Sequence, residues 1–453
     1  MFRPRNEVII TPGRVSYSQK ESLIVRSVEL RCGMRNHDGV ESYAILAPTN
    51  ALDMSLSPAT SAVSSDQRQA AHTKELSRKS AWMWFAFGLL GFAPRGWLWW
   101  NSIGSYDTLL WAAHAQSIIV LGVARTYERV LLFNHPPIMG IYAAHSWLWA
   151  HADVLRFARY MKLPGLAGEA LTVWALWRFA GYRAFVAYAW LPAAILVSAY
   201  HGSTDCLCAA LVLVAAISFD HEQYFLSGLL WSAALNVKLI PLVLLPVVVL
   251  GAPKMRDFIR LAIGLAIGLL SFIPPALKAA HAMYRNMLTY YPVVNNWGIS
   301  ALLNIAGRRP SMHLTFTSVQ HWYITGGRYI LLTAVLAVAL LSKFRCRLPM
   351  TIQAALGSAL FLVLAPGFGT QYVVFAAPLL CFVDLKTGMM WGWMSGLFIG
   401  HAYWASLMLS YPFQSTLPPR YPLSTPLGLL AWAILIHFIW RHSKAAWKCL
   451  PQT

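Results

Sequence analysis

Ionisable side chains concentrate in one stretch of this sequence, Gly104–Gly140, which lies between two apolar segments. Carboxylate, imidazole and guanidinium groups can move protons and bind anions. The side chains of these kinds in the stretch are Asp107, His114, Arg125, Glu128, Arg129 and His135. Only 12% of all residues are charged, and ionisable groups at the edge of hydrocarbon are costly, so the stretch is a candidate functional site. A plain solvated loop is the alternative interpretation.

The composition indicates which elements must position these groups. Of the 453 residues, 57% are hydrophobic and 20 are Trp, and the mean hydropathy is +0.51. These values are typical of polytopic membrane proteins and lie outside the range of soluble domains. The formal net charge of +19 comes from short Lys and Arg clusters between apolar runs, which is the pattern of topology signals and not of a nucleic-acid surface. The sequence therefore predicts an all-α polytopic membrane protein.

Polar tails flank the apolar part of the chain. Residues 1–79 contain no long apolar run, which predicts a disordered cytoplasmic tail without a secretory signal. A start assigned too early is the alternative, with Met54 or Met83 as the true first residue. We expect residues 80–441 to form one transmembrane domain and residues 442–453 a short basic cytoplasmic tail.

Apolar runs predict the membrane-spanning helices. Several runs are shorter than the roughly 20 residues of a usual span, which indicates tilted, paired or partly inserted helices, roughly 11–13 in all. The candidate spans are Ser80–Trp100, Pro136–Ala152, Leu166–Ala180, Ala184–Ala199, Leu207–Phe219, Phe225–Gly251, Phe258–Leu277, Tyr329–Leu341, Met350–Leu364, Tyr372–Val383, Met389–Leu409 and Leu427–Trp440. We expect Pro241 and Pro246 to break the run Phe225–Gly251.

Basic and aromatic residues at the ends of the runs predict the orientation. Arg78–Lys79 precede the first span and Trp97–Trp100 close it, so the first outer loop, residues 101–137, is expected outside. Pro136–Ala152 is then expected to return the chain to the basic segment Arg156–Lys162.

Later basic clusters repeat this pattern. The residues expected on the cytoplasmic side are Lys254, Arg256, Arg260, Lys343, Arg345, Arg347, Arg441, His442, Lys444 and Lys448. The segments Lys278–Gly326, Pro366–Thr370 and Ser410–Thr425 then lie outside. The side of His201–Asp205 stays open, because it depends on whether Leu166–Ala180 crosses completely.

The outer side thus gathers polar segments from distant parts of the chain. These segments are Asp107–His135, Tyr290–Trp297 and Gly367–Tyr372. Irregular backbone near a membrane is tolerated where it lines a water-filled cavity. A cavity that opens to both lipid and water suits a substrate with a lipid tail and a polar head.

Short motifs in this chain occur in the order of a known family. The acidic residue of SYD (Asp107) follows the first span, Tyr127 comes about twenty positions later, and FNHPP (Phe133–Pro137) opens the next helix. Later motifs are HGSTD (His201–Asp205), LNVKLIPLVLLP (Leu235–Pro246), NNWGIS (Asn295–Ser300) and APGFGTQYVVFAAPLL (Ala365–Leu380). Between about Ser80 and Leu380 the chain resembles the GT-C superfamily of integral-membrane glycosyltransferases, in the style of bacterial mannosyltransferase-like members that use polyprenol-phosphate hexoses.

The resemblance implies a GT-C-like helical bundle and a hexosyltransferase. Asp107 matches the acidic residue that is the catalytic base or orients it, and direct attack with a phosphate leaving group implies inversion at the sugar. Cationic or hydrogen-bonding groups would offset the charge that grows on the phosphate, and the candidates are Arg125, Arg129, Lys238, His135 and Arg285. The expected substrate-binding residues are Glu128, Arg129, His135, His201, Asp205, Lys238, Trp297, Gln371 and Tyr372.

No metal ligand is assigned from the sequence. Many members of the family carry a second acidic residue close to the first, and this chain has no Asp-x-Asp there, so a divalent metal cofactor stays open. Cys206 and Cys208 flank Leu207, and a helix turns them away from each other, which argues against a metal pair. The chain also lacks a Walker loop, a His-Glu-x-x-His pair and a Gly-x-Ser-x-Gly elbow.

These site assignments have structural alternatives. Asp107 could simply start an interfacial helix, Glu128–Arg129 could be a surface pair, and His201–Asp205 could be a short loop. His135 is as well suited to a structural hydrogen bond as to a phosphate contact. Lys238 among apolar residues costs roughly 2.5–3.5 kcal/mol at mid-membrane, so it needs a boundary or an anionic partner. Interface anchoring is the alternative for Trp297, Gln371 and Tyr372.

We therefore expect a membrane enzyme that moves a hexose, mannose or glucose, from a polyprenyl-phosphate donor to a lipid-linked or extracytoplasmic acceptor. A bacterial plasma membrane is favoured over an endoplasmic reticulum location, and no nucleic-acid partner is expected. The rival from another class is a secondary transporter or lipid flippase, which would also have broken helices and buried charge. A structural membrane protein without a reaction would leave Asp107 and Lys238 dispensable.

Overall fold

The computed structural model describes residues 82–130, 133–289, 297–306, 313–409 and 426–448. All of them belong to one of two units of the chain, Ser64–Thr453. The predicted N-terminal tail, residues 1–79, and the outer segment Tyr290–Asn296 lie outside the described residues.

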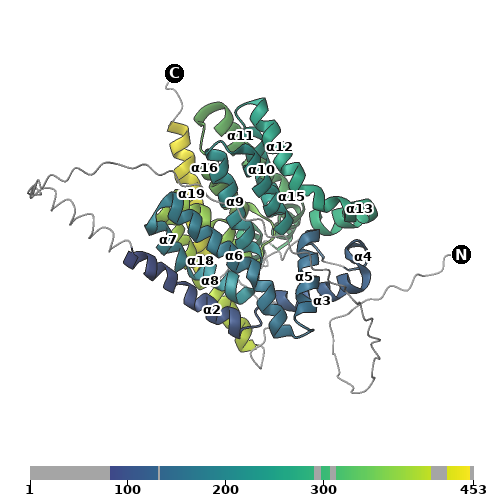
Figure 1. Cartoon of the computed structure of the whole chain (residues 1–453). Helices are drawn as coiled ribbons and strands as arrows, with labels where there is room; N and C mark the ends of the chain where they lie inside the picture. Colours follow the sequence, from purple (N-terminus) through teal and green to yellow (C-terminus); the bar gives the residue numbers. More distant parts are fainter. Residues whose placement is uncertain (1–81, 131–132, 290–296, 307–312, 410–425, 449–453) are drawn as a thin grey trace, which may run out of the picture. The chain divides into compact units, whose positions relative to one another are not determined.

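The regular elements of the described part of the chain are helices (Figure 1). They are α2 (Phe92–Asn101), α3 (Tyr106–Leu121), α4 (Val123–Arg129), α5 (Pro137–Trp149), α6 (Val154–Ala180), α7 (Tyr182–Ala189), α8 (Pro192–Ile195), η1 (Leu196–His201), α9 (Asp205–Asp220), α10 (Tyr224–Val237), η2 (Ile240–Leu244), α11 (Leu245–Gly251), α12 (Met255–Leu269), η3 (Leu270–Phe272), α13 (Ile273–Leu288), α14 (Gly298–Ala306), α15 (His313–Leu341), η5 (Ser342–Cys346), α16 (Met350–Leu364), η6 (Thr370–Phe375), α17 (Ala377–Val383), α18 (Leu385–Leu409) and α19 (Pro426–Lys448).

Two of these helices are long and apolar enough to cross a membrane, or up to four if each of two bent helix pairs counts as one span. The two are Met255–Leu288 and Ser318–Cys346. Apolar side chains are exposed at three- and four-residue intervals along the first of them, and Leu277 is the most exposed at 82%. Such a face on a helix is suited to lipid. The described residues thus support membrane-spanning helices, but fewer than the 11–13 expected from apolar runs.

The predicted first outer loop, residues 101–137, contains two helices instead of a loop. Ser105 starts α3 because its side chain accepts a hydrogen bond from the backbone N–H of Asp107 at 3.3 Å. α3 and α4 meet at Gly122, whose φ of 78° favours glycine, and their axes bend by 118°. This bend turns α4 back, so the pair is either a broken span or a re-entrant loop.

Several predicted boundaries agree with the structure and others shift. The run Met350–Leu364 is confirmed as α16, whereas α19 continues to Lys448, through residues expected to form a tail. α6 is longer than expected and runs through Pro164, which has no N–H to donate to the carbonyl of Tyr160. The hydroxyl of Tyr142 donates to that carbonyl at 2.6 Å, which explains how the helix continues.

The apolar run Phe225–Gly251 breaks earlier than its prolines predict. α10 ends at Val237, and Lys238 has extended backbone with φ −160° and ψ 148°. Pro241 lies in the first turn of η2 and Pro246 in that of α11, positions where the missing N–H costs little. The break places an ionisable side chain, that of Lys238, in the middle of otherwise apolar sequence.

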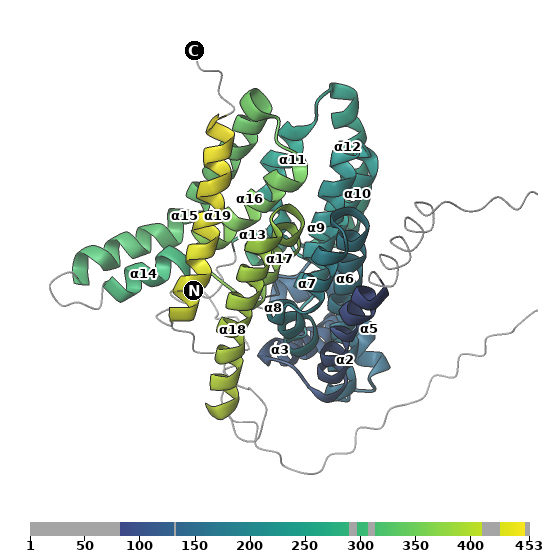
Figure 2. The same ribbon diagram turned by 90° about the vertical axis from the view of Figure 1, so that its left-hand side faces the viewer.

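α9 lies at the centre of the described helices and packs on α6, α10 and α16. Figure 2 shows α9, α10 and α12 side by side. Small residues allow the close contacts: a Cβ added at Gly168 of α6 would lie 2.3 Å from the backbone nitrogen of Leu207 in α9. Cys206 and Cys208 are buried in this packing, which is consistent with a structural role.

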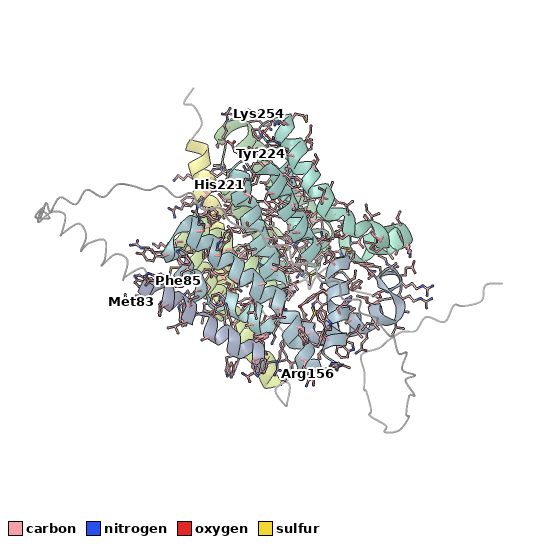
Figure 3. All side chains as sticks on the ribbon, in the orientation of Figure 1. Met83, Phe85, Arg156, His221, Tyr224 and Lys254 are labelled. Atoms are coloured by element: carbon pink, nitrogen blue, oxygen red, sulfur yellow. The ribbon has the colours of Figure 1, made fainter. Side chains whose placement is uncertain are left out.

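The basic segment Arg156–Lys162 lies beside the end of α2. Trp99 Nε1 donates to the Arg159 carbonyl at 2.8 Å, and Lys162 Nζ donates to the Ser102 carbonyl at 2.5 Å. α6 therefore begins beside the end of α2. Figure 3 shows Arg156 at one end of the described helices and Lys254 at the other.

Candidate functional site

The site is built around Asp107, in the first turn of α3. Its Oδ2 lies 3.0 Å from His201 Nε2 and accepts a longer hydrogen bond, 3.5 Å, from Gln371 Nε2. The side chain of Asp107 is 39% exposed, whereas that of His201 is 4% exposed. Three segments that are far apart in the sequence therefore meet at one accessible carboxylate. Because His201 contacts Asp107, the two residues lie on the same side of the described helices. The sequence left the side of His201 open.

His201 is held on both sides of its ring. Its Nδ1 lies 2.8 Å from the hydroxyl of Tyr403 in α18, and the two rings stack with centroids 5.7 Å apart. Its backbone carbonyl accepts hydrogen bonds from Ser105, from Oγ at 3.1 Å and from the backbone nitrogen at 3.5 Å. Gly202 follows in the left-handed conformation, with φ 78°, and ends η1.

A second polar group adjoins the first through the HGSTD motif. Lys238 Nζ lies 2.8 and 2.7 Å from the two oxygens of Asp205, which is fully buried at the start of α9. Ser203 donates a hydrogen bond to the same carboxylate. The ammonium also lies 4.8 Å from the ring centroid of Tyr372, directly after Gln371 in the sequence. Lys238 thus has the anionic partner that its apolar surroundings require.

His135 of FNHPP is held by aromatic neighbours. Its ring stacks on Trp111 of α3 at 3.7 Å, and its carbonyl accepts a hydrogen bond from Tyr127 at 2.5 Å. His114, one turn after Trp111, is buried, and neither of its ring nitrogens has a hydrogen-bond partner in the described part of the chain. These contacts fix the position of His135 through its ring face and its carbonyl.

The environment favours the ionised form of Asp107. Hydrogen bonds from His201 Nε2 and Gln371 Nε2 to its Oδ2 favour the carboxylate over the neutral acid. A carboxylate that stays ionised can accept a proton at neutral pH.

Glu128, Arg129 and Trp297 are not brought to this cluster by any hydrogen bond or ion pair seen among the described residues. Glu128 and Arg129 are exposed at the end of α4. Trp297 is buried, donates to the Leu362 carbonyl at 2.6 Å and stacks on Phe368 at 4.5 Å. Its contacts are those of a core residue that supports the segment before Gln371. The remaining candidates gather, namely Asp107, His135, His201, Asp205, Lys238, Gln371 and Tyr372.

Tyr403 and Ser105 are not among the site residues expected from the sequence. Tyr403 lies in the apolar run of α18, where a tyrosine is indistinguishable from an interface anchor. Ser105 had a usable signal, because a serine followed by an acidic residue in the first turn is typical of a helix start. Lys162 of the predicted basic segment is fully buried against the end of α2.

The described residues contain no group of three or more His, Cys, Asp or Glu side chains that could hold a metal ion. Asp107 alone remains as an accessible carboxylate in the site. Magnesium is often bound through one or two carboxylates together with substrate phosphates, so a chelator experiment belongs with any assay of this site.

Comparison with protein-family models and with curated proteins found no match to this chain.

Proposed function

We propose that this chain is a membrane glycosyltransferase, similar to the GT-C superfamily, that transfers a hexose from a polyprenyl-phosphate donor to a lipid-linked or extracytoplasmic acceptor. The observation that carries the proposal is the hydrogen bonding and exposure of the Asp107 carboxylate. Its Oδ2 is engaged by His201 and Gln371, while Oδ1 accepts no hydrogen bond from the described residues and the side chain is partly exposed. One oxygen of an ionised carboxylate is thus available to a substrate.

Glycosyl transfer to a hydroxyl needs such an oxygen. The acceptor oxygen attacks the anomeric carbon, its proton passes to Asp107 Oδ1, and the bond from the anomeric carbon to the phosphate oxygen breaks with its electron pair. The new bond forms opposite the leaving phosphate, so the sugar inverts. The products are the glycosylated acceptor and a polyprenyl phosphate, and the protonated Asp107 returns its proton to solvent.

The leaving phosphate gains negative charge, and Lys238 is the cation placed beside Asp107. Asp205 binds its ammonium with both oxygens, and an ammonium has three N–H donors, so one is left for another acceptor. Arg125 and Arg129 are exposed on α4, which suits them to attract an anionic lipid and not to touch the leaving group.

A transporter or lipid flippase remains the alternative from another class. It would share the broken helices and the buried ion pair. In such a protein the accessible carboxylate would bind a coupling proton and not a sugar hydroxyl, so an assay of hexose transfer separates the two classes. The bacterial plasma membrane is the location we propose, on the style of the motifs alone.

The test is transfer of radiolabelled hexose from polyprenyl-phosphate mannose or glucose to a lipid acceptor pool, with purified protein, with and without chelator. Asp107→Asn should lower transfer by roughly 10²- to 10⁴-fold. Asp257→Asn is the matched control, because Asp257 is also a first-turn aspartate, at the start of α12. Equal activity of wild type and Asp107→Asn, or lipid movement across liposomes with no hexose transfer, would reject the proposal.

A further inference from the structure

His201 is placed so that it cannot serve a substrate directly. Its side chain is 4% exposed, and both ring nitrogens are taken, Nε2 by Asp107 and Nδ1 by Tyr403. A histidine that binds a sugar or a phosphate needs a ring nitrogen that is free and accessible to that ligand. The sequence predicts His201 as a substrate-binding residue. Its hydrogen bonds with Asp107 and Tyr403 indicate instead that it orients a neighbouring side chain.

The two partners select one form of the imidazole. An ionised carboxylate only accepts hydrogen bonds, so Nε2 must carry the proton that faces Asp107. Nδ1 of the neutral ring is then an acceptor, and the hydroxyl of Tyr403 donates to it. Without that hydroxyl, the proton could occupy either nitrogen, and the contact with Asp107 would be lost in one of the two tautomers.

Backbone contacts hold Asp107 and His201 close together, independently of the bond between their side chains. Ser105 donates to the carbonyl of His201 through both Oγ and its backbone nitrogen, and Ser105 also caps the helix that begins at Tyr106. A Cβ at Gly104 would lie 2.7 Å from the carbonyl oxygen of Tyr200, so the two segments are in close backbone contact. Asp107 and His201 are therefore held together by main chain as well as by side chain.

We infer that His201 and Tyr403 act as positioning residues for Asp107, holding Oδ2 so that Oδ1 is the oxygen presented to the acceptor hydroxyl. The expected effect on hexose transfer rests on the proposed function. The orientation of Asp107 by His201 and Tyr403 does not depend on that function. Neither residue touches the reacting atoms. Tyr403 sets the tautomer of His201, and His201 sets the rotation of the carboxylate.

The experiment combines a spectroscopic and a kinetic measurement on Tyr403→Phe. ¹⁵N NMR of histidine-labelled protein reports the tautomer, with the His201 signal identified by its loss in His201→Gln. We expect the Nε2–H tautomer in wild type and a mixture in Tyr403→Phe. Transfer should fall by roughly 10- to 100-fold in kcat, with KM unchanged, as for other residues that orient a functional ligand.

The acid side of the pH profile gives a second readout. The titratable groups that face Asp107 are His201, His135 and Lys238, with His114 on its own helix. Loosening the His201 contact in Tyr403→Phe removes part of the interaction that favours ionised Asp107. The acid limb should therefore move to higher pH, an effect that lost packing alone would not cause.

Tyr200→Phe is the matched control, because its ring packs against Tyr403 at 5.0 Å and the change again removes one hydroxyl. It should leave the His201 signal and the pH profile unchanged. A wild-type Nδ1–H tautomer, or a Tyr403→Phe variant that matches wild type in both readouts, overturns the inference. If Tyr403→Phe does not fold, the wild-type tautomer alone decides. A locked Nε2–H tautomer without hexose transfer supports the positioning and rejects the proposed function instead.

Discussion

Lys238 Nζ contacts both carboxylate oxygens of Asp205, at 2.8 and 2.7 Å, across a break between two helices. Asp205 is fully buried and the side chain of Lys238 is 16% exposed. Removing one member of such a pair leaves an uncompensated buried charge, whereas removing both leaves none. The pair therefore holds the start of α9 against the end of α10.

The first prediction concerns the stability of this pair. Lys238→Met should destabilise the protein by about 3–5 kcal/mol, and Lys238→Met combined with Asp205→Asn should recover most of that loss. Thermal unfolding of the purified variants in detergent measures both effects. A double variant as unstable as the single one would show that the lysine stabilises through packing and not through charge.

The second prediction concerns the contact between α6 and α9. Gly168→Ala should lower the free energy of unfolding of the protein by about 1–3 kcal/mol or more, because the alanine Cβ would overlap the backbone of Leu207. Gly96→Ala is the matched control, since a Cβ there has no neighbour within 4 Å and alanine favours a helix. The yield of folded protein and its melting temperature report the difference. Equal melting temperatures for the two variants would contradict the close packing.

The third prediction concerns pH. The hydrogen bonds from His201 and Gln371 favour the ionised carboxylate of Asp107, so this form stabilises the fold at neutral pH. The contribution should be lost as the pH falls and the carboxylate takes up a proton. Asp107→Asn lacks it at every pH, so the gap in melting temperature between wild type and Asp107→Asn should narrow on acidification. A constant gap would mean that the charge of Asp107 does not change over the pH range measured.

The fourth prediction concerns the side of the membrane on which Arg156 lies. Single cysteines at Arg156 and Lys254, in a variant without the six native cysteines, should react with impermeant maleimide from opposite sides of sealed vesicles. A cysteine at Arg159 serves as a check, because Arg159 contacts the end of α2 through its bond to the Trp100 carbonyl at 3.0 Å. Labelling of positions 156 and 254 from the same side would contradict the fold.

Local sequence was a good guide to single helices and a poor one to the contacts between them. The run Met350–Leu364 begins after a proline and is mostly apolar, so its limits could be predicted. The contacts of the basic segment Arg156–Lys162 with the end of α2 could not be predicted, because charge rules treat each apolar run separately.

By itself, the sequence determined the class of this protein and the residue types of its candidate site. Apolar runs and clustered charge predict membrane helices, and a polar stretch such as SYD stands out in apolar surroundings because charge near lipid is costly. The tertiary structure alone decided which groups meet. Asp107 and His201 are 94 positions apart, and His201 and Tyr403 are 202 positions apart. Only packing of α3, η1 and α18 brings them into contact, and no local pattern encodes a contact between such distant residues.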